Sequence, residues 1–160
     1  MTWKLHSVIE VSGDPKGQPR PRAFARKVTA ISKKTGQPEQ VWKSRVYDKG
    51  TAEGWKSLIA LAARDHLPAS PLACPVRVDV EFYFRRPLRL MKKKSPEGFL
   101  PHTAKPDRDN LDKAVLDTLT QIGFFQDDAL VVEGTIRKFY TRIDSAPGAL
   151  IEIYTPEEVG

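Results

Sequence analysis

Residues 76–84, VRVDVEFYF, alternate apolar and polar side chains over nine consecutive positions. Successive side chains of a strand point to opposite faces, so this alternation is typical of a strand with one face on a core and the other toward water. The apolar face of such a strand must be covered by another layer of structure. The segment therefore predicts a sheet with helices or a second sheet on one side.

Two helices are expected to provide that cover. In residues 51–66 apolar side chains recur at helical spacing, Thr51 is a candidate N-cap, and Pro68 ends the pattern. A second helix is expected from residue 110 to about 122, with Gly123 as its stop signal.

Further strands are expected at residues 7–12, 129–143 and 149–155, and a long basic hairpin around the turn in KKTGQPE (33–39). This order of elements predicts a single α+β domain over residues 1–160. We expect a mixed β-sheet with two main helices packed on it and basic loops around it.

The charge is strongly basic, with a formal net charge of +6. Lysine and arginine crowd residues 16–49 and 85–94, whereas acids dominate the C-terminal part. A solvated surface of mixed charge is one interpretation. The clustering in two segments favours a nucleic acid partner instead.

The cysteine and histidine content and the hydropathy of the chain exclude several classes of protein. Cys74 is the single cysteine, which excludes an intramolecular disulfide, and the three histidines are scattered, so no zinc-type cluster is expected. No apolar run approaches the ~20 residues of a membrane span. The N-terminus MTWKLHSVIE lacks the apolar core of a signal peptide, and we expect the protein to stay in the cytoplasm.

An acidic constellation follows the second basic segment, in KPDRDNLDK (105–113). Asp109 could simply cap the helix, the commonest role of an aspartate there. That interpretation leaves Asp107 unexplained, and also the pair Asp127 and Asp128 beyond the helix. Hard cations such as Mg²⁺ take one or two carboxylates together with water and substrate phosphate. The acids are therefore candidate metal ligands.

Lys113 lies one helical turn after Asp109. The spacing fits an ordinary surface pair, and equally a fixed ammonium that holds a phosphate oxygen or stabilises charge on the leaving oxygen. We interpret Asp112 as a surface residue and Asp117 as a structural partner of Lys113.

The two acid pairs must meet if they form one site. The helix between them would be about 20 Å long. An extended chain from Gly123 to Asp128 spans about 17–20 Å. The chain could return to the start of the helix only if GFFQ (123–126) runs back along it, with Phe124 and Phe125 packing that segment down. A fold that keeps the pairs apart would contradict this interpretation.

Competing motifs do not match. An EF-hand loop beginning at Asp107 would need a ligand and a glycine where Leu111 and Asp112 stand. No P-loop, GxSxG or HExxH motif occurs. A glycosidase could use two carboxylates but has little need of flanking basic clusters.

The segment KPDRDNLDKAVLDTLTQIGFFQDDALVV (105–132) resembles the signature of the RusA family of Holliday junction resolvases, which has Asp-x-Asp-Asn-x-x-Lys, a helix, and an Asp-Asp pair. KGQPRPRAF (16–24) and YDKGTAEGW (47–55) are similar to bacteriophage-type members. The resemblance implies a Mg²⁺- or Mn²⁺-dependent endonuclease, in a bacterial cell and encoded by a phage or prophage, that acts as a homodimer and nicks opposing strands of four-way DNA junctions.

By position, the resemblance implies that Asp107, Asp109 and Asp128 are catalytic metal ligands and that Lys113 is the essential lysine. Asp127 would either bind a second metal ion or hold the ligands of the first ion in place without binding it. The basic clusters would bind the phosphates of the DNA backbone without reading its sequence. The candidate DNA-binding residues are Lys16, Arg20, Arg22, Arg26, Lys92, Lys93 and Lys94.

Alternatives remain. A nuclease for flaps or other branches would keep the same site and change the substrate. A non-catalytic DNA-binding protein would use its acids only to cap a helix and pair with lysines. Trp42, Phe24 and Tyr47 are candidates to stack on an opened junction, although such residues are more often part of a core or hairpin.

Overall fold

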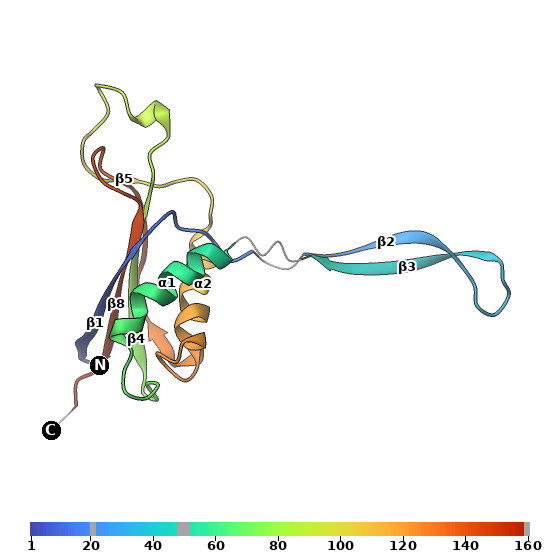
Figure 1. The fold of residues 1–160 in the computed structure, drawn as a ribbon, viewed down its shortest axis with the longest axis horizontal. Coiled ribbons are helices and arrows are strands. Elements are labelled where there is room, and N and C mark those ends of the chain that lie inside the picture. Colours follow the sequence, from blue (N-terminus) through green and yellow to red (C-terminus); the bar gives the residue numbers. More distant parts are fainter. Residues whose placement is uncertain (20–21, 48–51, 159–160) are drawn as a thin grey trace. The chain divides into compact units, whose positions relative to one another are not determined.

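A computed structural model describes residues 1–19, 22–47 and 52–158 (Figure 1). The chain divides into a larger compact unit, formed by residues 1–18 and the chain from 51 onward, and a smaller unit, residues 19–50. None of the helices in the described residues is long and apolar enough to cross a bilayer.

The larger unit is built on a mixed sheet, as the sequence predicts. Its order is β1-β8-β4-β7-β5, and β6 also pairs with β4. β4 is parallel to β6 and β7 and antiparallel to β8, which is antiparallel to β1. The strands are β1 (Trp3–Ser12), β4 (Val76–Phe84), β5 (Leu100–Pro101), β6 (Val131–Glu133), β7 (Ile136–Tyr140) and β8 (Gly148–Pro156).

Helices α1 (Glu53–Ala63) and α2 (Arg108–Gln121) cover one face of this sheet (Figure 1). The five apolar side chains of β4 face them and are buried, while its four intervening side chains are half-buried on the other face. Ile59 of α1 and Leu111 of α2 are fully buried in the same core. The predicted α+β class and the predicted strand at residues 76–84 are therefore confirmed.

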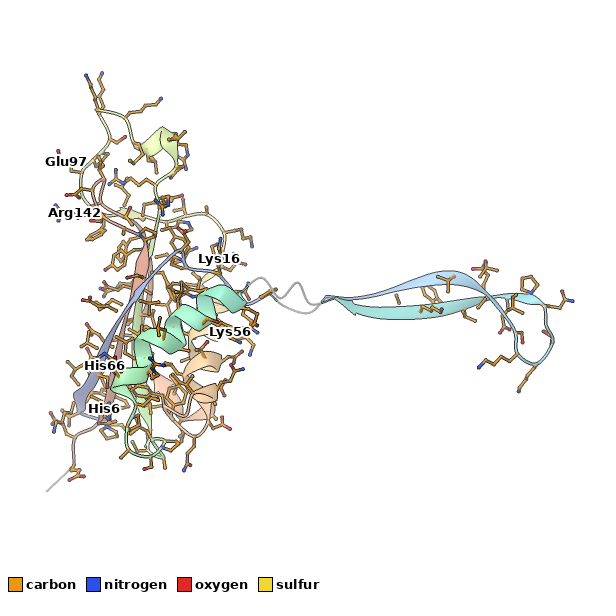
Figure 2. The ribbon with its side chains drawn as sticks, viewed as in Figure 1. His6, Lys16, Lys56, His66, Glu97 and Arg142 are labelled. Carbon is orange, nitrogen blue, oxygen red and sulfur yellow. The ribbon has the colours of Figure 1, made fainter. Side chains whose placement is uncertain are left out.

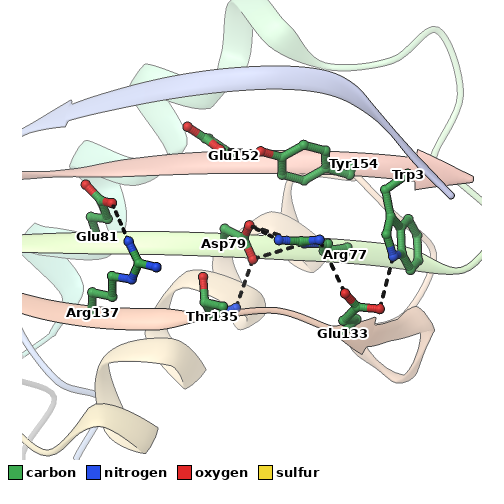
Figure 3. Close-up of polar contacts among 9 residues, drawn as sticks. All are labelled: Trp3, Arg77, Asp79, Glu81, Glu133, Thr135, Arg137, Glu152 and Tyr154. Carbon is green, nitrogen blue, oxygen red and sulfur yellow. Dashed lines mark hydrogen bonds and ion pairs between the residues drawn. The ribbon is translucent and has the colours of Figure 1, made fainter. Parts of the chain in front are cut away.

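The face of the sheet opposite the helices carries a network of charges (Figure 3). Arg77 pairs with Asp79 at 2.8 Å and with Glu133 at 3.3 Å. Burial alone would raise the pKa of Asp79, but hydrogen bonds from Arg77 and Thr135 outweigh it and hold that pKa below its usual value. The charges on this face are therefore paired within the chain, partly along β4 itself and partly with Glu133 of β6.

The predicted basic hairpin is present in the smaller unit. β2 (Arg22–Ile31) pairs antiparallel with β3 (Pro38–Tyr47). The turn contains Gly36 at φ 70°, a left-handed conformation that glycine adopts without strain. Trp42 is exposed, with the Lys27 ammonium 5.4 Å from its ring centre. The side chains of Phe24 and Tyr47 lie outside what the structure describes.

Several element boundaries differ from the sequence prediction. The helix expected over residues 51–66 ends as α1 at Ala63 and continues as a 3₁₀ turn, η1 (Arg64–His66); Ala52 is its N-cap, and Thr51 lies outside the described residues. The second helix begins two residues earlier than expected, at Arg108. The loop after β4 also contains a 3₁₀ turn, η2 (Leu88–Leu90), and strand β5.

The single strand expected over residues 129–143 is divided into η3 (Asp128–Leu130), β6 and β7. The division falls at Gly134, where a Cβ atom would lie 2.0 Å from the carbonyl oxygen of Val78. Only glycine allows the chain to approach β4 so closely as it passes from one pairing register to the next.

Candidate active site

Asp107 stands at the N-terminal end of α2 as its N-cap. Its carbonyl oxygen accepts a hydrogen bond from the Leu111 amide at 3.2 Å. Its carboxylate is held by the Lys105 ammonium, with the two oxygens 2.7 and 2.8 Å from Nζ. The helix begins one residue after Asp107, so the alternative interpretation of Asp109 as the helix cap does not hold.

Asp109 lies inside the first turn of α2 and is exposed. One of its carboxylate oxygens accepts from the Asn110 amide at 3.0 Å. A carboxylate in the first turn is stabilised by the partial positive charge of the helix N-terminus. Asp107 and Asp109 thus present two acids at one exposed helix end.

Lys113 pairs with Asp117, one turn further along the helix, at 3.3 Å. The predicted structural partnership of these residues is confirmed. The ammonium is directed toward the C-terminal part of α2, the opposite direction from Asp109. Its role at a metal stays a prediction.

The interpretation of Asp112 as a surface residue is wrong, because the residue is half-buried. Burial raises the pKa of Asp112 above its usual value, against the opposing effect of the Arg108 charge. The residue belongs to the inner side of α2.

Lys138 is a site residue that the sequence analysis missed. It lies on β7 opposite Phe82, on the face of the sheet that carries the helices. Its ammonium donates to the Ala104 carbonyl at 2.8 Å. Burial lowers the pKa of Lys138 and so does the charge of Lys105, while the Asp107 carboxylate acts in the opposite direction. Asp107 therefore lies between two lysine ammoniums.

The alternation of the sequence contained a signal for Lys138. Ile136, Lys138 and Tyr140 share one strand face, and both neighbours of the lysine are apolar. A lysine at an inward position of a strand is rarely buried without a partner.

The first basic segment reaches the same helix end. The Gln18 amide donates to the Asn110 carbonyl at 2.8 Å. A Cβ atom at Gly17 would lie 2.9 Å from the Pro106 side chain, so this segment packs closely on the chain before α2. Lys16 is exposed on it (Figure 2). Arg20 lies outside the described residues, and so do the side chains of Arg22 and Arg26.

The second acid pair follows the other end of α2. Gly123, at φ 81°, turns the chain, and the Phe124 amide bonds to Leu119 of the last helical turns at 2.9 Å. The Gln126 amide then donates to Leu72 at 3.0 Å. GFFQ therefore does not run back along the helix, and the prediction that it brings Asp128 back beside Asp107 and Asp109 within one chain is wrong. Its buried phenylalanines fix it beside Leu72.

Asp127 and Asp128 have different positions in this segment. An Asp127 carboxylate oxygen accepts from the Ala129 amide at 2.8 Å and caps η3. Asp128 is the first residue of η3 and is exposed. Figure 1 shows the chain entering α2 from one end and this segment remaining at the other. In residues 1–19, 22–47 and 52–158 no group of three His, Cys, Asp or Glu residues could hold a metal ion.

The second basic segment is organised by a buried arginine. Arg86 is 5% exposed. Its guanidinium donates to the carbonyls of Thr141 at 2.7 Å, Leu90 at 3.2 Å and Pro96 at 2.6 Å, and also to that of Gly98. This base, counted with the phosphate-binding cluster in the sequence, therefore holds the loop together and is not available to DNA.

The loop that Arg86 holds exposes the three lysines predicted to bind DNA. Lys92, Lys93 and Lys94 are all exposed. A turn between Lys92 and Ser95 fixes their backbone, with the Ser95 amide 2.8 Å from the Lys92 carbonyl. Figure 2 shows Glu97 of this loop and Arg142 at the same end of the larger unit.

Comparison with known proteins gives a family and a relative. A family model described as "Endodeoxyribonuclease RusA" matches residues 12–154. A Bacillus subtilis (strain 168) protein named "Uncharacterized protein YqaN" is 32% identical over 136 residues, which cover 82% of this chain and 85% of that protein. RusA proteins are nucleases of Holliday junctions that use divalent metals. The match spans both acid pairs and the Asp-x-Asp-Asn motif, and the chain belongs to the RusA endodeoxyribonuclease family.

Proposed function

We propose that this chain is a Mg²⁺-dependent endodeoxyribonuclease that resolves four-way DNA junctions by paired, symmetric nicks during recombination and repair. Residues 1–160 would act as one endonuclease domain, with Mn²⁺ as a substitute ion, in the cytoplasm of a bacterial cell and encoded by a phage or prophage. One observation carries the proposal. In a RusA family member, Asp107 at the start of α2 lies near the ammoniums of Lys105 and Lys138, and the segment that carries Lys16 packs on the same helix end.

The acids fit a hard cation in chemistry and position. Asp107 and Asp109 are exposed carboxylates at a helix N-terminus, and carboxylate oxygens are the ligands that Mg²⁺ prefers. The remaining positions around such an ion are usually taken by water and substrate phosphate. Asp128 is the third proposed ligand, and Asp127 supports it by capping η3. Because Asp128 follows the other end of α2, it would reach the first two acids from the second subunit of the homodimer that the family resemblance implies.

The ion, when bound, would activate water and neutralise charge on the scissile phosphate. The chain's own residues position that phosphate. Lys138 is held on the sheet by Ala104, so its ammonium is fixed in place before substrate binds. Lys105 has a more exposed side chain and pairs with Asp107 when no phosphate is present. The Lys105 ammonium can pass from the carboxylate to a phosphate oxygen, while the Lys138 ammonium attracts the phosphate from its fixed position. Lys113 is proposed to stabilise the leaving oxygen.

Lysines outside the acid site would bind the arms of the junction through backbone phosphates. Lys16 lies on the segment that packs against α2, and Lys92, Lys93 and Lys94 on the loop held by Arg86. Arg20, Arg22 and Arg26 are proposed to contribute in the same way. Such contacts carry no sequence information and make affinity strongly dependent on salt.

Asp109→Asn tests the proposal directly. The variant should lose at least about 10³-fold in the Mg²⁺-dependent nicking rate, because it removes a carboxylate at the ion. Its binding to a synthetic four-way junction should be unchanged or tighter. Asp65→Asn, the same change at an exposed aspartate of η1, is the control and should cleave normally. Retained cleavage by Asp109→Asn would contradict the proposal, and stronger cleavage of flaps or forks than of junctions would favour the branched-DNA alternative.

A further inference from the structure

The outer half of the hairpin, residues 27–43, has two faces of different character (Figure 1). Opposed residues of paired strands share a face, and so do residues two apart along one strand. The register of β2 and β3 therefore places six residues on one face, which we call the tryptophan face: Lys27, Thr29, Ile31, Pro38, Gln40 and Trp42. The other face carries Val28, Ala30, Glu39 and Val41.

The tryptophan face exposes large apolar side chains. Trp42 is 68% exposed and Ile31 is 73% exposed, and Pro38, which lies opposite Ile31, is exposed as well. A two-stranded ribbon is at best marginally stable by itself in water. Apolar side chains that gather on an exposed face typically mark a surface that binds a partner. We therefore expect the tryptophan face to be covered when the protein acts.

The charge of the outer hairpin indicates an anionic partner. Residues 27–43 contain one acid, Glu39, which lies on the other face, and four exposed lysines. Two of the lysines lie at the inner end of the hairpin segment and two in the turn at its outer end: Lys27 and Lys43, and Lys33 and Lys34. The turn is closed by the Ser32 carbonyl, which accepts from the Gly36 amide at 2.8 Å. Positive charge thus flanks the tryptophan face at both ends, as binding to a polyanion requires.

Thr29 and Gln40 supply polar recognition in the middle of the face. Gln40 Nε2 donates to Thr29 Oγ1 at 2.9 Å, which fixes the plane of the amide. The amide has a second N–H and a carbonyl oxygen to offer a ligand. A donor and an acceptor side by side match N7 and N6 of adenine, which face the major groove of DNA. Ile31, two residues from Thr29 on the same face, can contact the methyl group of a neighbouring thymine.

We propose that the outer hairpin lies in the major groove of a DNA duplex, with the tryptophan face toward the base edges. The major groove, about 12 Å wide, admits a two-stranded β-ribbon, and the minor groove, about 6 Å wide, is too narrow for two strands about 4.8 Å apart with their side chains. Gln40 reads an adenine, Ile31 covers a thymine methyl group, and the lysines bind the phosphates on either side. This inference rests on the proposed function, since the duplex is an arm of the junction, and it adds contacts that depend on base sequence.

A chemical footprint of the Asp109→Asn chain without metal ions tests which groove is occupied. A synthetic four-way junction is used, because its single branch point fixes the register of the protein on each arm. Dimethyl sulfate methylates guanine N7 in the major groove and adenine N3 in the minor groove. We expect protection of guanine N7 along part of an arm, and its loss when Gln40→Val and Trp42→Val are combined. Val41→Thr, on the other face, is the control and should keep the protection. Valine and threonine both favour strands, so these variants retain the ribbon.

Altered bases in the protected arm test the individual contacts. Replacement of a contacted thymine by uracil removes one methyl group and should weaken binding by about fourfold. The Ile31→Ser version should bind the thymine and uracil arms equally. Replacement of the contacted adenine by 7-deazaadenine should weaken binding by about tenfold, and the Gln40→Val version should not distinguish the two bases.

The outcomes separate this inference from the proposed function. Protection of adenine N3 in place of guanine N7 overturns the inference, and so does an equal effect of uracil on chains with and without Ile31. Binding to anionic phospholipid vesicles that Trp42→Val abolishes, without any footprint on DNA, assigns the face to a membrane and also overturns it. A chain that nicks junctions with a footprint independent of the hairpin overturns the inference alone. A chain that nicks no branched DNA but protects guanine N7 of a duplex through the hairpin sinks the proposed function and leaves the groove contact standing.

Discussion

The two ends of α2 carry the same residue type in different surroundings. At the N-terminal end, Asp107 lies between Lys105 and Lys138 on an exposed surface. At the C-terminal end, Asp127 caps a short helix beside two buried phenylalanines. The N-terminal end exposes its charges, and the C-terminal end uses most of its residues to hold the fold.

The difference teaches that an Asp-Asp pair in a motif need not act as a unit. Both residues are exposed, but the Asp127 carboxylate accepts a hydrogen bond from the Ala129 amide and so caps η3, whereas Asp128 is the first residue of η3. Substitutions at the C-terminal end should therefore affect stability, with Asp128 as the exception. Substitutions at the N-terminal end should affect activity.

The largest effect on stability is expected from Phe124→Ala. The side chain is fully buried in the core, and its removal should lower the free energy of unfolding by about 3–5 kcal/mol. Denaturant unfolding measures this loss. The nicking rate per folded molecule should stay near wild type at a temperature where the variant is folded. A fall in that rate larger than the unfolded fraction explains would mean that this end does more than hold the fold.

A smaller effect, on activity alone, is expected from Lys138→Gln. The amide can still donate to Ala104, but the positive charge beside Asp107 is lost, and kcat should fall by about a hundredfold. Lys105→Gln is the matched control, because its side chain is far more exposed, and should cost much less.

Thermal unfolding of the Lys138→Gln variant should match wild type, which separates loss of charge from loss of structure. Equal losses of kcat in the Lys138 and Lys105 variants would show that the fixed position of Lys138 has no importance. Unchanged kcat in both would remove the lysines from the site.

The elements that carry the two ends of α2 could be predicted from the sequence. The path of the chain between them could not, and the reason is physical. The alternation in residues 76–84 and the apolar spacing after Asn110 predict β4 and α2, because both signals come from burial on one face. The predicted length of α2 likewise gives the distance that the chain would have to cover to bring Asp128 back beside Asp107. The direction that the chain takes after Gly123 depends on Leu72, which is distant in sequence, and no local pattern reports it.

Side-chain partners were harder to predict than elements. Arg86 belongs to a run of bases, and only its four carbonyl partners, from Leu90 to Thr141, show that it is internal. Lys138 lies in a segment predicted as one long strand, and the alternation around it gives an inward face only for the part after Gly134, where β7 begins. The acids therefore stand out in the sequence as candidates, and the lysine fixed near Asp107 does not.

The smallest expected effect separates the two aspartates of the second pair. Asp127→Ala removes the cap of η3 and should lower the free energy of unfolding by about 1 kcal/mol. For a chain of this size that shifts the melting temperature by about 2–4 °C. Asp127→Asn, whose side-chain oxygen can still accept from Ala129, should recover most of this loss. Asp128→Ala, one residue away and exposed, should leave the melting temperature unchanged and abolish nicking. If Asp127→Asn also abolishes nicking while remaining fully stable, Asp127 acts at the metal and the pair works as a unit after all.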